Sequence, residues 1–199
     1  MIKAVILDWG GVLIDDPEPD MISYCAGSLG VNEESFLSVY NKFKDNFQKG
    51  IISEDILWNK VCKDLKIQKP NTASLWGDAF RHVYSPKEKM FSLVSELHNK
   101  GYKVGFLSNT EVPAMRHFHE KGYDMFDVIV FSCKEGTIKP ERRIYEIILD
   151  KLGVKSHEAI FIDDKEKYLE CAKKLGINTI MFISPDQVKK ELSYFSQEF

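Results

Sequence analysis

IKAVILDWGG, residues 2–11, begins with a short and nearly continuous apolar run and ends in an aspartate, a tryptophan and two glycines. An apolar run of this length is typical of a β-strand that is buried on both faces of a sheet. Asp8 follows the run directly, and Gly10 and Gly11 follow Asp8 after one residue. The segment therefore predicts a buried strand with a carboxylate at its carboxyl end.

The same pattern returns four times along the chain. Apolar runs lie at residues 103–107, 127–131, 159–162 and 179–183, and serine or aspartate follows each of them. Segments with apolar residues at helical spacing lie at 87–100, 141–152 and 166–175, and a glycine ends each one. Strands that alternate with helices predict βαβ units. We therefore expect an α/β fold with a Rossmann-like core of three layers, in which helices cover both faces of a parallel sheet.

Residues 15–85 interrupt this alternation. They contain no clear strand pattern, but amphipathic helix candidates lie at 20–29, 33–47, 53–65 and 72–84. Ser53 and Thr72 are the expected N-caps of the last two. We expect residues 15–85 to form a helical domain inserted after the first strand, so that residues 1–14 and 86–199 together form the core.

Composition limits the classes of partner. The chain has 199 residues, a net charge of −3 and 44% hydrophobic residues, which is ordinary for a globular domain. No basic surplus is present, so we expect no nucleic-acid partner. No apolar stretch approaches the roughly 20 residues that span a bilayer, so we expect no membrane segment. Residues 1–8 lack a signal-peptide pattern, which predicts a cytoplasmic protein.

Polar residues gather where the predicted strands end. Ligands of open α/β sheets bind beyond the carboxyl ends of the strands, so we expect Asp8, Ser108, Asn109, Asp163 and Asp164 to lie close together. Taken singly, such residues are equally typical of helix caps and turns. Gathered carboxylates repel one another unless they share a proton or a cation, and oxygen ligands favour Mg²⁺.

Lys139 is the expected positive counter-charge of these carboxylates. It precedes Pro140 at the start of a predicted helix. Together the polar residues form four short motifs in a fixed order. They are ILDWGGVL at 6–13, FLSNT at 106–110, IKP at 138–140 and FIDD at 161–164.

This order of motifs resembles that of the haloacid dehalogenase-like hydrolase superfamily, over essentially the whole chain. The position of residues 15–85 matches that of the family's helical cap. The resemblance implies a phosphatase-like member of the superfamily, in which Asp8 attacks phosphorus and forms an aspartyl-phosphate while Ser108 and Lys139 assist. The residues implied for substrate binding are Gly10, Gly11, Asn109 and Thr110, the last two through their backbone N–H groups.

The resemblance also implies a Mg²⁺ site. By motif position, its ligands would be Asp8, the carbonyl oxygen of Gly10, and Asp164, with Asp163 in support through water. A divalent cation and Lys139 would neutralise the charge that otherwise keeps a carboxylate away from a phosphate dianion.

Gly10 departs from the pattern of the superfamily. Most of its phosphatases carry a second aspartate two residues after the nucleophile, where it acts as general acid and base. Such assistance is typically worth about 10²–10⁴-fold in rate. A water molecule, a cap residue such as Asp15 or Asp16, or a leaving group of low pKa could take its place.

Two rival functions follow from the same departure. Haloacid dehalogenases also lack the second aspartate, but they work without metal and typically replace the two acids of the fourth motif with serine and asparagine. This chain keeps Asp163 and Asp164, which favours phosphoryl transfer. The other rival is a non-catalytic binding protein on a degenerate hydrolase scaffold. We therefore predict a Mg²⁺-dependent phosphatase that acts on a small phosphorylated metabolite, a phosphate monoester.

Residues outside the motifs could also reach the ligand. The candidates from the cap are Asp16, Phe47, Trp58, Trp76 and Arg81. After the fourth motif, Lys165 is expected on a solvated helix face. For Tyr168 the alternatives are a place around the site and the packing of its helix, and packing is favoured. For Trp9 two positions stay open, the wall of the pocket and the packing under the cap.

Overall fold

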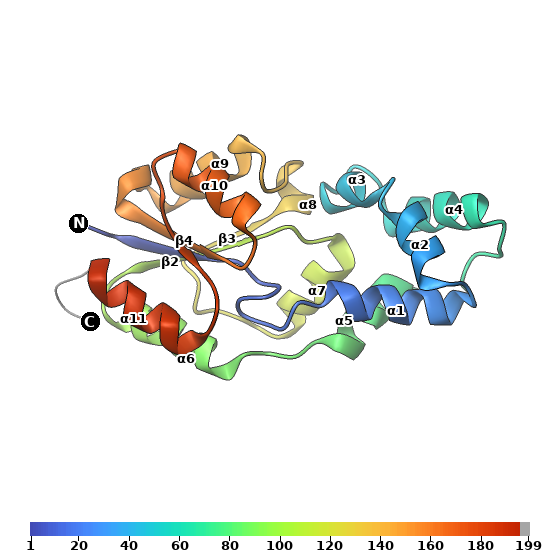
Figure 1. Ribbon diagram of the computed structural model, residues 1–199, viewed down its shortest axis with the longest axis horizontal. Helices are drawn as coiled ribbons and strands as arrows, with labels where there is room; N and C mark the ends of the chain where they lie inside the picture. The colour runs from blue at the N-terminus through green and yellow to red at the C-terminus, as the bar shows by residue number, and fades with distance from the viewer. Residues whose placement is uncertain (196–199) are drawn as a thin grey trace.

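A computed structural model describes residues 1–195, in which five strands form one sheet (Figure 1). They are β1 (Ala4–Leu7), β2 (Lys103–Ser108), β3 (Val128–Phe131), β4 (Ala159–Asp163) and β5 (Asn178–Met181). Their order is β3-β2-β1-β4-β5, and each neighbouring pair is parallel. The predicted α/β fold with a parallel sheet is confirmed, and β1 is its central strand.

Helices cover both faces of the sheet. α9 (Arg142–Leu152) and α10 (Glu166–Lys174) lie over one face, and α6 (Glu88–Asn99) and α11 (Pro185–Phe195) over the other (Figure 1). Successive side chains of a strand point to opposite faces. Accordingly, Ile6 of β1 packs in the cluster of α9 and α10, whereas the next residue, Leu7, packs in the cluster of α6 and α11.

Three helices of the core were not predicted. They are α7 (Val112–Glu120), α8 (Ser132–Glu135) and α11, and a 3₁₀ turn, η1 (Ser156–Glu158), also precedes β4. α8 is a single turn, too short for a periodic pattern. α7 has Pro113 in its first turn, a position where proline favours a helix start, so this signal could have located it.

Within residues 15–85 the regular structure is helical. The helices are α1 (Glu18–Leu29), α2 (Glu33–Tyr40), α3 (Lys44–Gln48), α4 (Glu54–Leu65) and α5 (Leu75–Val83). We call them the helical group, and they lie together beyond one end of the sheet (Figure 1). The helix predicted over 33–47 is two helices. The domain boundaries at 14/15 and 85/86 stay a prediction.

One of the two expected helix caps is confirmed and the other is wrong. Ser53 caps α4, because its Oγ accepts a hydrogen bond from the Ile56 N–H at 3.3 Å. The cap of α5 is Ser74 instead of Thr72, since the Ser74 Oγ accepts from the Gly77 N–H at 3.0 Å. The Thr72 hydroxyl donates to the side chain of Asp78, at 2.9 Å from Oδ2, and not to the backbone of α5.

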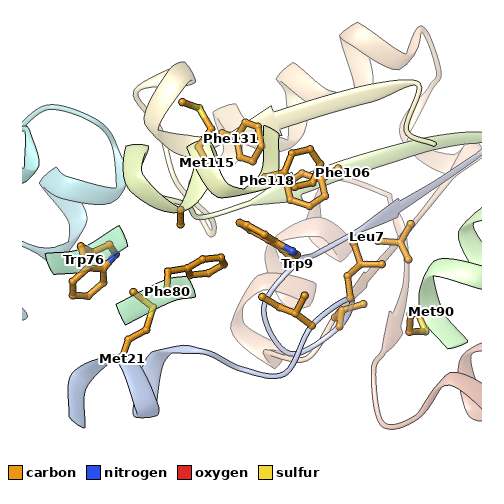
Figure 2. Packing of buried hydrophobic residues seen from close by; sticks show 14 of the residues in the cluster. Leu7, Trp9, Met21, Trp76, Phe80, Met90, Phe106, Met115, Phe118 and Phe131 are labelled. Carbon is orange, nitrogen blue, oxygen red and sulfur yellow. The ribbon is translucent and has the colours of Figure 1, made fainter. Parts of the chain in front are cut away.

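The helical group and the core share one hydrophobic cluster. The Trp9 ring lies 4.9 Å from the ring of Phe80 in α5, 5.7 Å from Phe106 in β2 and 5.4 Å from Phe118 in α7. Figure 2 shows Phe80 between Trp9 and Trp76. Burial of these rings favours one position of the helical group at the end of the sheet.

The helices described within residues 1–195 are all too short or too polar to span a membrane.

Candidate active site

The carboxyl ends of β1, β2 and β4 meet at the edge of the sheet that faces the helical group (Figure 1). Leu7 of β1 lies opposite Ile162 of β4, so the next residues, Asp8 and Asp163, lie level with each other. Ser108 is the last residue of the neighbouring strand β2. The parallel register therefore brings together polar residues that are 100 and 155 positions apart in the chain.

Lys139 joins the two strand-end carboxylates. Its Nζ lies 2.7 Å from Asp8 Oδ1 and 2.6 Å from Asp163 Oδ2, and all three side chains are buried. The pKa of Asp8 is raised to about 7, chiefly because the carboxylate is buried; Lys139 opposes this rise and the Asp163 charge adds to it. Burial also works against the charge of Lys139, but the two carboxylates outweigh it and raise the lysine pKa. The ammonium group thus holds Asp8 in a fixed position.

Asn109 positions Lys139 through its backbone. The Asn109 Nδ2 donates to the Lys139 carbonyl at 2.9 Å, and its Oδ1 accepts from the Lys139 N–H at 2.7 Å. Tyr168 of α10 lies beside the same lysine, with its ring centroid 4.9 Å from Nζ. Tyr168 also lines the cavity described below. Of the two alternatives for Tyr168, the structure therefore supports a place beside the site, although packing was favoured.

Ser108 and Thr110 form a hydrogen-bonded turn after β2. The Thr110 Oγ1 donates to Ser108 Oγ at 2.6 Å, and the Thr110 N–H donates to Ser132 Oγ at 2.8 Å. Ser132, which follows β3, in turn donates to the carbonyl of Gln48 at the end of α3. The Thr110 N–H is thus engaged within the protein, in contrast to its expected use for a phosphoryl oxygen, because Ser132 lies in front of it.

The three carboxylates fit a divalent cation. Asp8, Asp163 and Asp164 each offer an oxygen, and these oxygens lie within 4.8 Å of one another. The buried Oδ1 of Asp164 has no hydrogen-bond partner among residues 1–195. Asp163 is engaged at both oxygens, by Lys139 and by the Lys165 N–H at 2.8 Å. A buried oxygen without a partner, beside other carboxylates, is typical of a hard-cation site such as that of Mg²⁺.

Gly11 lies against this site. Its φ is +85°, and a Cβ added there would lie 2.3 Å from Asp164 Oδ2. Glycine is therefore required both for its backbone conformation and for the close approach of the carboxylate. Contact of Gly10, Gly11 or Asn109 with a substrate stays a prediction.

A cavity of about 90 Å³ lies between the strand ends and the helical group. Its wall includes Asp8, Ser108 and Lys139 from the core, and Met21, Tyr40 and Trp76 from the helical group. Trp9 lines the cavity as well as packing against Phe80, so both positions left open for it apply. The site is therefore enclosed by two parts of the chain that are separate in sequence.

Of the ligand-contact candidates in residues 15–85, some line the cavity and others do not. Asp16 and Trp76 line the cavity. Phe47 and Trp58 are buried inside the helical group, because they pack on the aromatic rings of α2 and α5, and they do not border the described cavity. Arg81 is also absent from the cavity wall, since its guanidinium donates to Glu120 at 3.0 Å on the surface.

Lys165 was expected on a solvated face, and this expectation is wrong. It lines the cavity, and its Nζ lies 3.5 Å from Asp16 Oδ2. The lysines later in α10 are exposed. Because they are, the whole lysine-rich segment 165–174 has the sequence pattern of an exposed helix face. The signal that could have singled out Lys165 is its position directly after FIDD.

Glu111 was also missed. It is buried, it lines the cavity, and it accepts a hydrogen bond from Trp76 Nε1 at 3.2 Å. Burial raises the pKa of Glu111. Its position directly after FLSNT was the available signal, and the contact with Trp76 shows that it joins the start of α7 to the helical group.

Comparisons with known proteins agree with this geometry. A model of the family described as haloacid dehalogenase-like hydrolase matches residues 6–182. The chain is 30% identical over 200 residues to Acyl-CoA dehydrogenase family member 10 of Mus musculus, which covers 96% of this chain but 19% of that protein. It is 29% identical over 179 residues to Sesquiterpene phosphatase astK of Aspergillus oryzae, which covers 88% and 87%.

A solved structure has the same fold. It is a HAD family enzyme of Bacteroides thetaiotaomicron in complex with magnesium and inorganic phosphate, with a TM-score of 0.75 and 24% identity over 91% of this chain and 94% of that one. This likeness concerns the fold alone. The family match covers most of the sheet, the motif residues and most of the helices, and the chain therefore belongs to the haloacid dehalogenase-like hydrolase family.

Proposed function

We propose that the protein is a Mg²⁺-dependent phosphatase that hydrolyses a small phosphate monoester through an aspartyl-phosphate on Asp8. The observation that carries this proposal is the pairing of Asp8 with Lys139 beside the buried Oδ1 of Asp164, which has no hydrogen-bond partner in the described part of the chain. This arrangement holds a nucleophile still and leaves oxygens for a cation next to it. Similarity to a protein named as a sesquiterpene phosphatase supports the proposal.

The reaction has two displacements at phosphorus. An oxygen of Asp8 attacks the phosphorus, the bond to the ester oxygen breaks, and the leaving oxygen takes up a proton from solvent water to give the alcohol. A water molecule then attacks the phosphorus, the bond to Asp8 breaks, and inorganic phosphate is released. Lys139 fixes the direction of Asp8 during both steps, and Asn109 fixes Lys139.

Asp8 and Asp164 would hold the Mg²⁺ ion, together with the Gly10 carbonyl. When bound, the ion supplies charge neutralisation between the carboxylate and the phosphate dianion. Asp163 is already bound to Lys139 and the Lys165 N–H, so it would orient the lysine and contact the ion through water. Ser108 and the Asn109 N–H would bind the phosphoryl oxygens.

The helical group of residues 15–85 would serve as a cap. It supplies Met21, Tyr40 and Trp76 to the cavity wall, on the side away from Asp8 and its neighbours. In that position it would exclude water and contact the organic part of the ester.

Two other functions are less well supported. Dehalogenation at carbon by Asp8 needs no cation, and it gives no reason for a second acid at position 164 whose buried oxygen finds no partner among residues 1–195. A non-catalytic binding protein would have no need to bury Asp8, Lys139 and Asp163, since buried charges cost free energy.

The test is a panel of phosphate monoesters assayed with Mg²⁺ and with a chelator. We expect turnover that requires Mg²⁺, and Asp8→Asn should lose about 10³-fold or more of kcat. Asp150→Asn is the matched control, because Asp150 is exposed on α9. Turnover of 2-haloacids in the presence of a chelator would favour the dehalogenase. Mg²⁺ binding without turnover of any ester would favour the binding protein.

A further inference from the structure

Position 10 has no side chain, and Pro17 fills the space beside it. A Cβ added to Gly10 would lie 3.1 Å from Pro17 Cδ. Gly10 also forms an isolated β-bridge with Ile14, so the chain folds back over the loop that follows Asp8. The segment before α1 therefore occupies the place into which a second acid at position 10 would extend.

This segment carries two aspartates that face different ways. Asp15 is 63% exposed at its side chain, and its Oδ1 lies 2.6 Å from Lys87 Nζ. Asp16 is 37% exposed, and it lines the same cavity as Asp8 and Lys139. Because Pro17 lies against Gly10, the neighbouring Asp16 lies at the site, whereas Asp15 does not.

Two contacts hold the Asp16 carboxylate in place. Its Oδ1 accepts a hydrogen bond from the Glu18 N–H at 3.2 Å, and its Oδ2 lies 3.5 Å from Lys165 Nζ. Lys165 also interacts electrostatically with Asp8 and Asp164, so the pair of Asp16 and Lys165 borders the reacting end of the cavity. An aspartate is ordinarily a carboxylate at neutral pH, and in that form it can accept a proton.

We propose that Asp16 accepts the proton of the water that hydrolyses the aspartyl-phosphate, in place of the side chain that Gly10 lacks. This inference rests on the proposed function. One O–H bond of the water breaks and its proton goes to Asp16, while the water oxygen bonds to phosphorus. The bond from phosphorus to the Asp8 oxygen breaks, and Asp8 leaves as a carboxylate. Asp16 then releases the proton to solvent.

Lys165 is a positioning residue in this scheme. Lys165 follows β4, whereas Asp16 precedes α1. The lysine can therefore hold the Asp16 carboxylate toward the cavity from the core side of the site. Asp16 also interacts electrostatically with Asp164, and its place beside the site gives Lys165 a reason to point inward.

The experiment compares Asp16→Asn with Asp15→Asn on p-nitrophenyl phosphate in Mg²⁺. Asparagine keeps an oxygen that can accept from the Glu18 N–H, so the first turn of α1 is preserved. We expect Asp16→Asn to release one equivalent of nitrophenol in a burst and then turn over about 10²–10⁴-fold more slowly than wild type. Intact-mass measurement should find the phosphorylated protein, and KM should fall together with kcat because only the second step is slowed.

The controls separate the two proposals. Asp15→Asn should match wild type, and Asp8→Asn/Asp16→Asn should form no phosphorylated protein. An active wild type with an Asp16→Asn variant that is equally fast, or that is slow without a burst, would overturn the role of Asp16 and leave the phosphatase intact. A wild type inert toward every ester in Mg²⁺ would overturn the phosphatase and the role of Asp16 together.

Discussion

Asp8 occupies a position where its charge is costly to the folded protein. Its pKa rises from an ordinary 3.8 to about 7, because the effect of burial, with a smaller addition from the Asp163 charge, outweighs the opposing effect of Lys139. A pKa that is higher in the folded than in the unfolded protein means that the folded state binds the proton more tightly. The resulting stabilisation is fully present below pH 3.8 and is lost as the pH rises through about 7.

Asp8→Asn should therefore stabilise the metal-free protein at alkaline pH. With a chelator present at pH 8, we expect the free energy of unfolding to exceed that of wild type by an amount on the order of 4 kcal/mol, and the excess should largely vanish toward pH 4. Urea denaturation followed across this pH range measures it. Asp150→Asn should show no such trend. A variant that is less stable than wild type at pH 8 would contradict the burial cost assigned to Asp8.

Gly11→Ala should weaken Mg²⁺ binding through Asp164. A methyl group at position 11 would displace the Asp164 carboxylate, and loss of such supporting geometry typically costs about 10–100-fold in metal affinity. Calorimetric titration with Mg²⁺ measures the change. Gly101→Ala is the matched control, since Gly101 has a similar φ of +81° with open space around it. Equal Mg²⁺ affinity in the two variants would show that Asp164 is not a ligand.

The residues brought together at the site could be predicted where they end strands. Asp8, Ser108 and Asp163 were placed correctly because parallel strands end at one edge, and this is a consequence of topology alone. Lys165 and Tyr168 could not be placed in this way. Their direction depends on how α10 is rotated against the sheet and on the position of the helical group, which are tertiary properties.

At the scale of elements, α4 and α5 are joined by a single carboxylate. Glu54, in the first turn of α4, accepts hydrogen bonds from the Trp76 N–H at 2.7 Å and from the Ser74 hydroxyl at 2.7 Å. Ser74 is also the N-cap of α5. One hydroxyl thus both starts α5 and attaches it to α4.

Ser74→Ala should destabilise the protein more than Thr72→Ala does. The first change removes the cap and the bond to Glu54, and loss of a serine cap typically costs about 1 kcal/mol, within a range of roughly 0.5–2. Thr72 lies outside α5 and donates to the exposed Asp78, so its loss should cost much less. Urea denaturation of both variants decides between them. A larger cost for Thr72→Ala would restore it as the functional cap.

The break between α2 and α3 shows why some elements could not be predicted. Phe36, Tyr40, Phe43 and Phe47 continue a helical spacing without interruption, so the periodic pattern indicates one helix. The chain nevertheless leaves the helix after Tyr40 and begins another at Lys44. Both helices still bury aromatic residues on the same side, which is why periodicity alone does not reveal the turn.

At the scale of the whole molecule, one hydrophobic cluster extends from the sheet into the helical group. It contains Leu7 and Phe106 of the core and Phe36 and Trp58 of the helical group. Figure 2 shows the part of it around Trp9, where Phe80 contacts the core ring directly. Separation of the two parts would expose this apolar surface to water, at a cost that rises with its area.

We therefore expect the helical group and the core to unfold in a single cooperative transition. The three tryptophans make this measurable, since Trp9 reports on the core and Trp58 and Trp76 report on the helical group. In Trp9→Phe, and in Trp58→Phe/Trp76→Phe, the fluorescence midpoint in urea should coincide with the circular-dichroism midpoint. A tryptophan transition at lower urea in Trp9→Phe alone would show that the helical group unfolds by itself.

The contact of Trp9 with Phe80 also limits how such a protein can acquire new substrates. Residues 15–85 form one continuous segment, which recombination could in principle exchange between relatives. A replacement for residues 15–85 would have to present a ring of matching shape to Trp9, or leave a cavity beside the loop that follows β1. New specificity is therefore more readily reached by point substitutions on the cavity wall, at Met21, Tyr40 or Trp76, than by wholesale exchange.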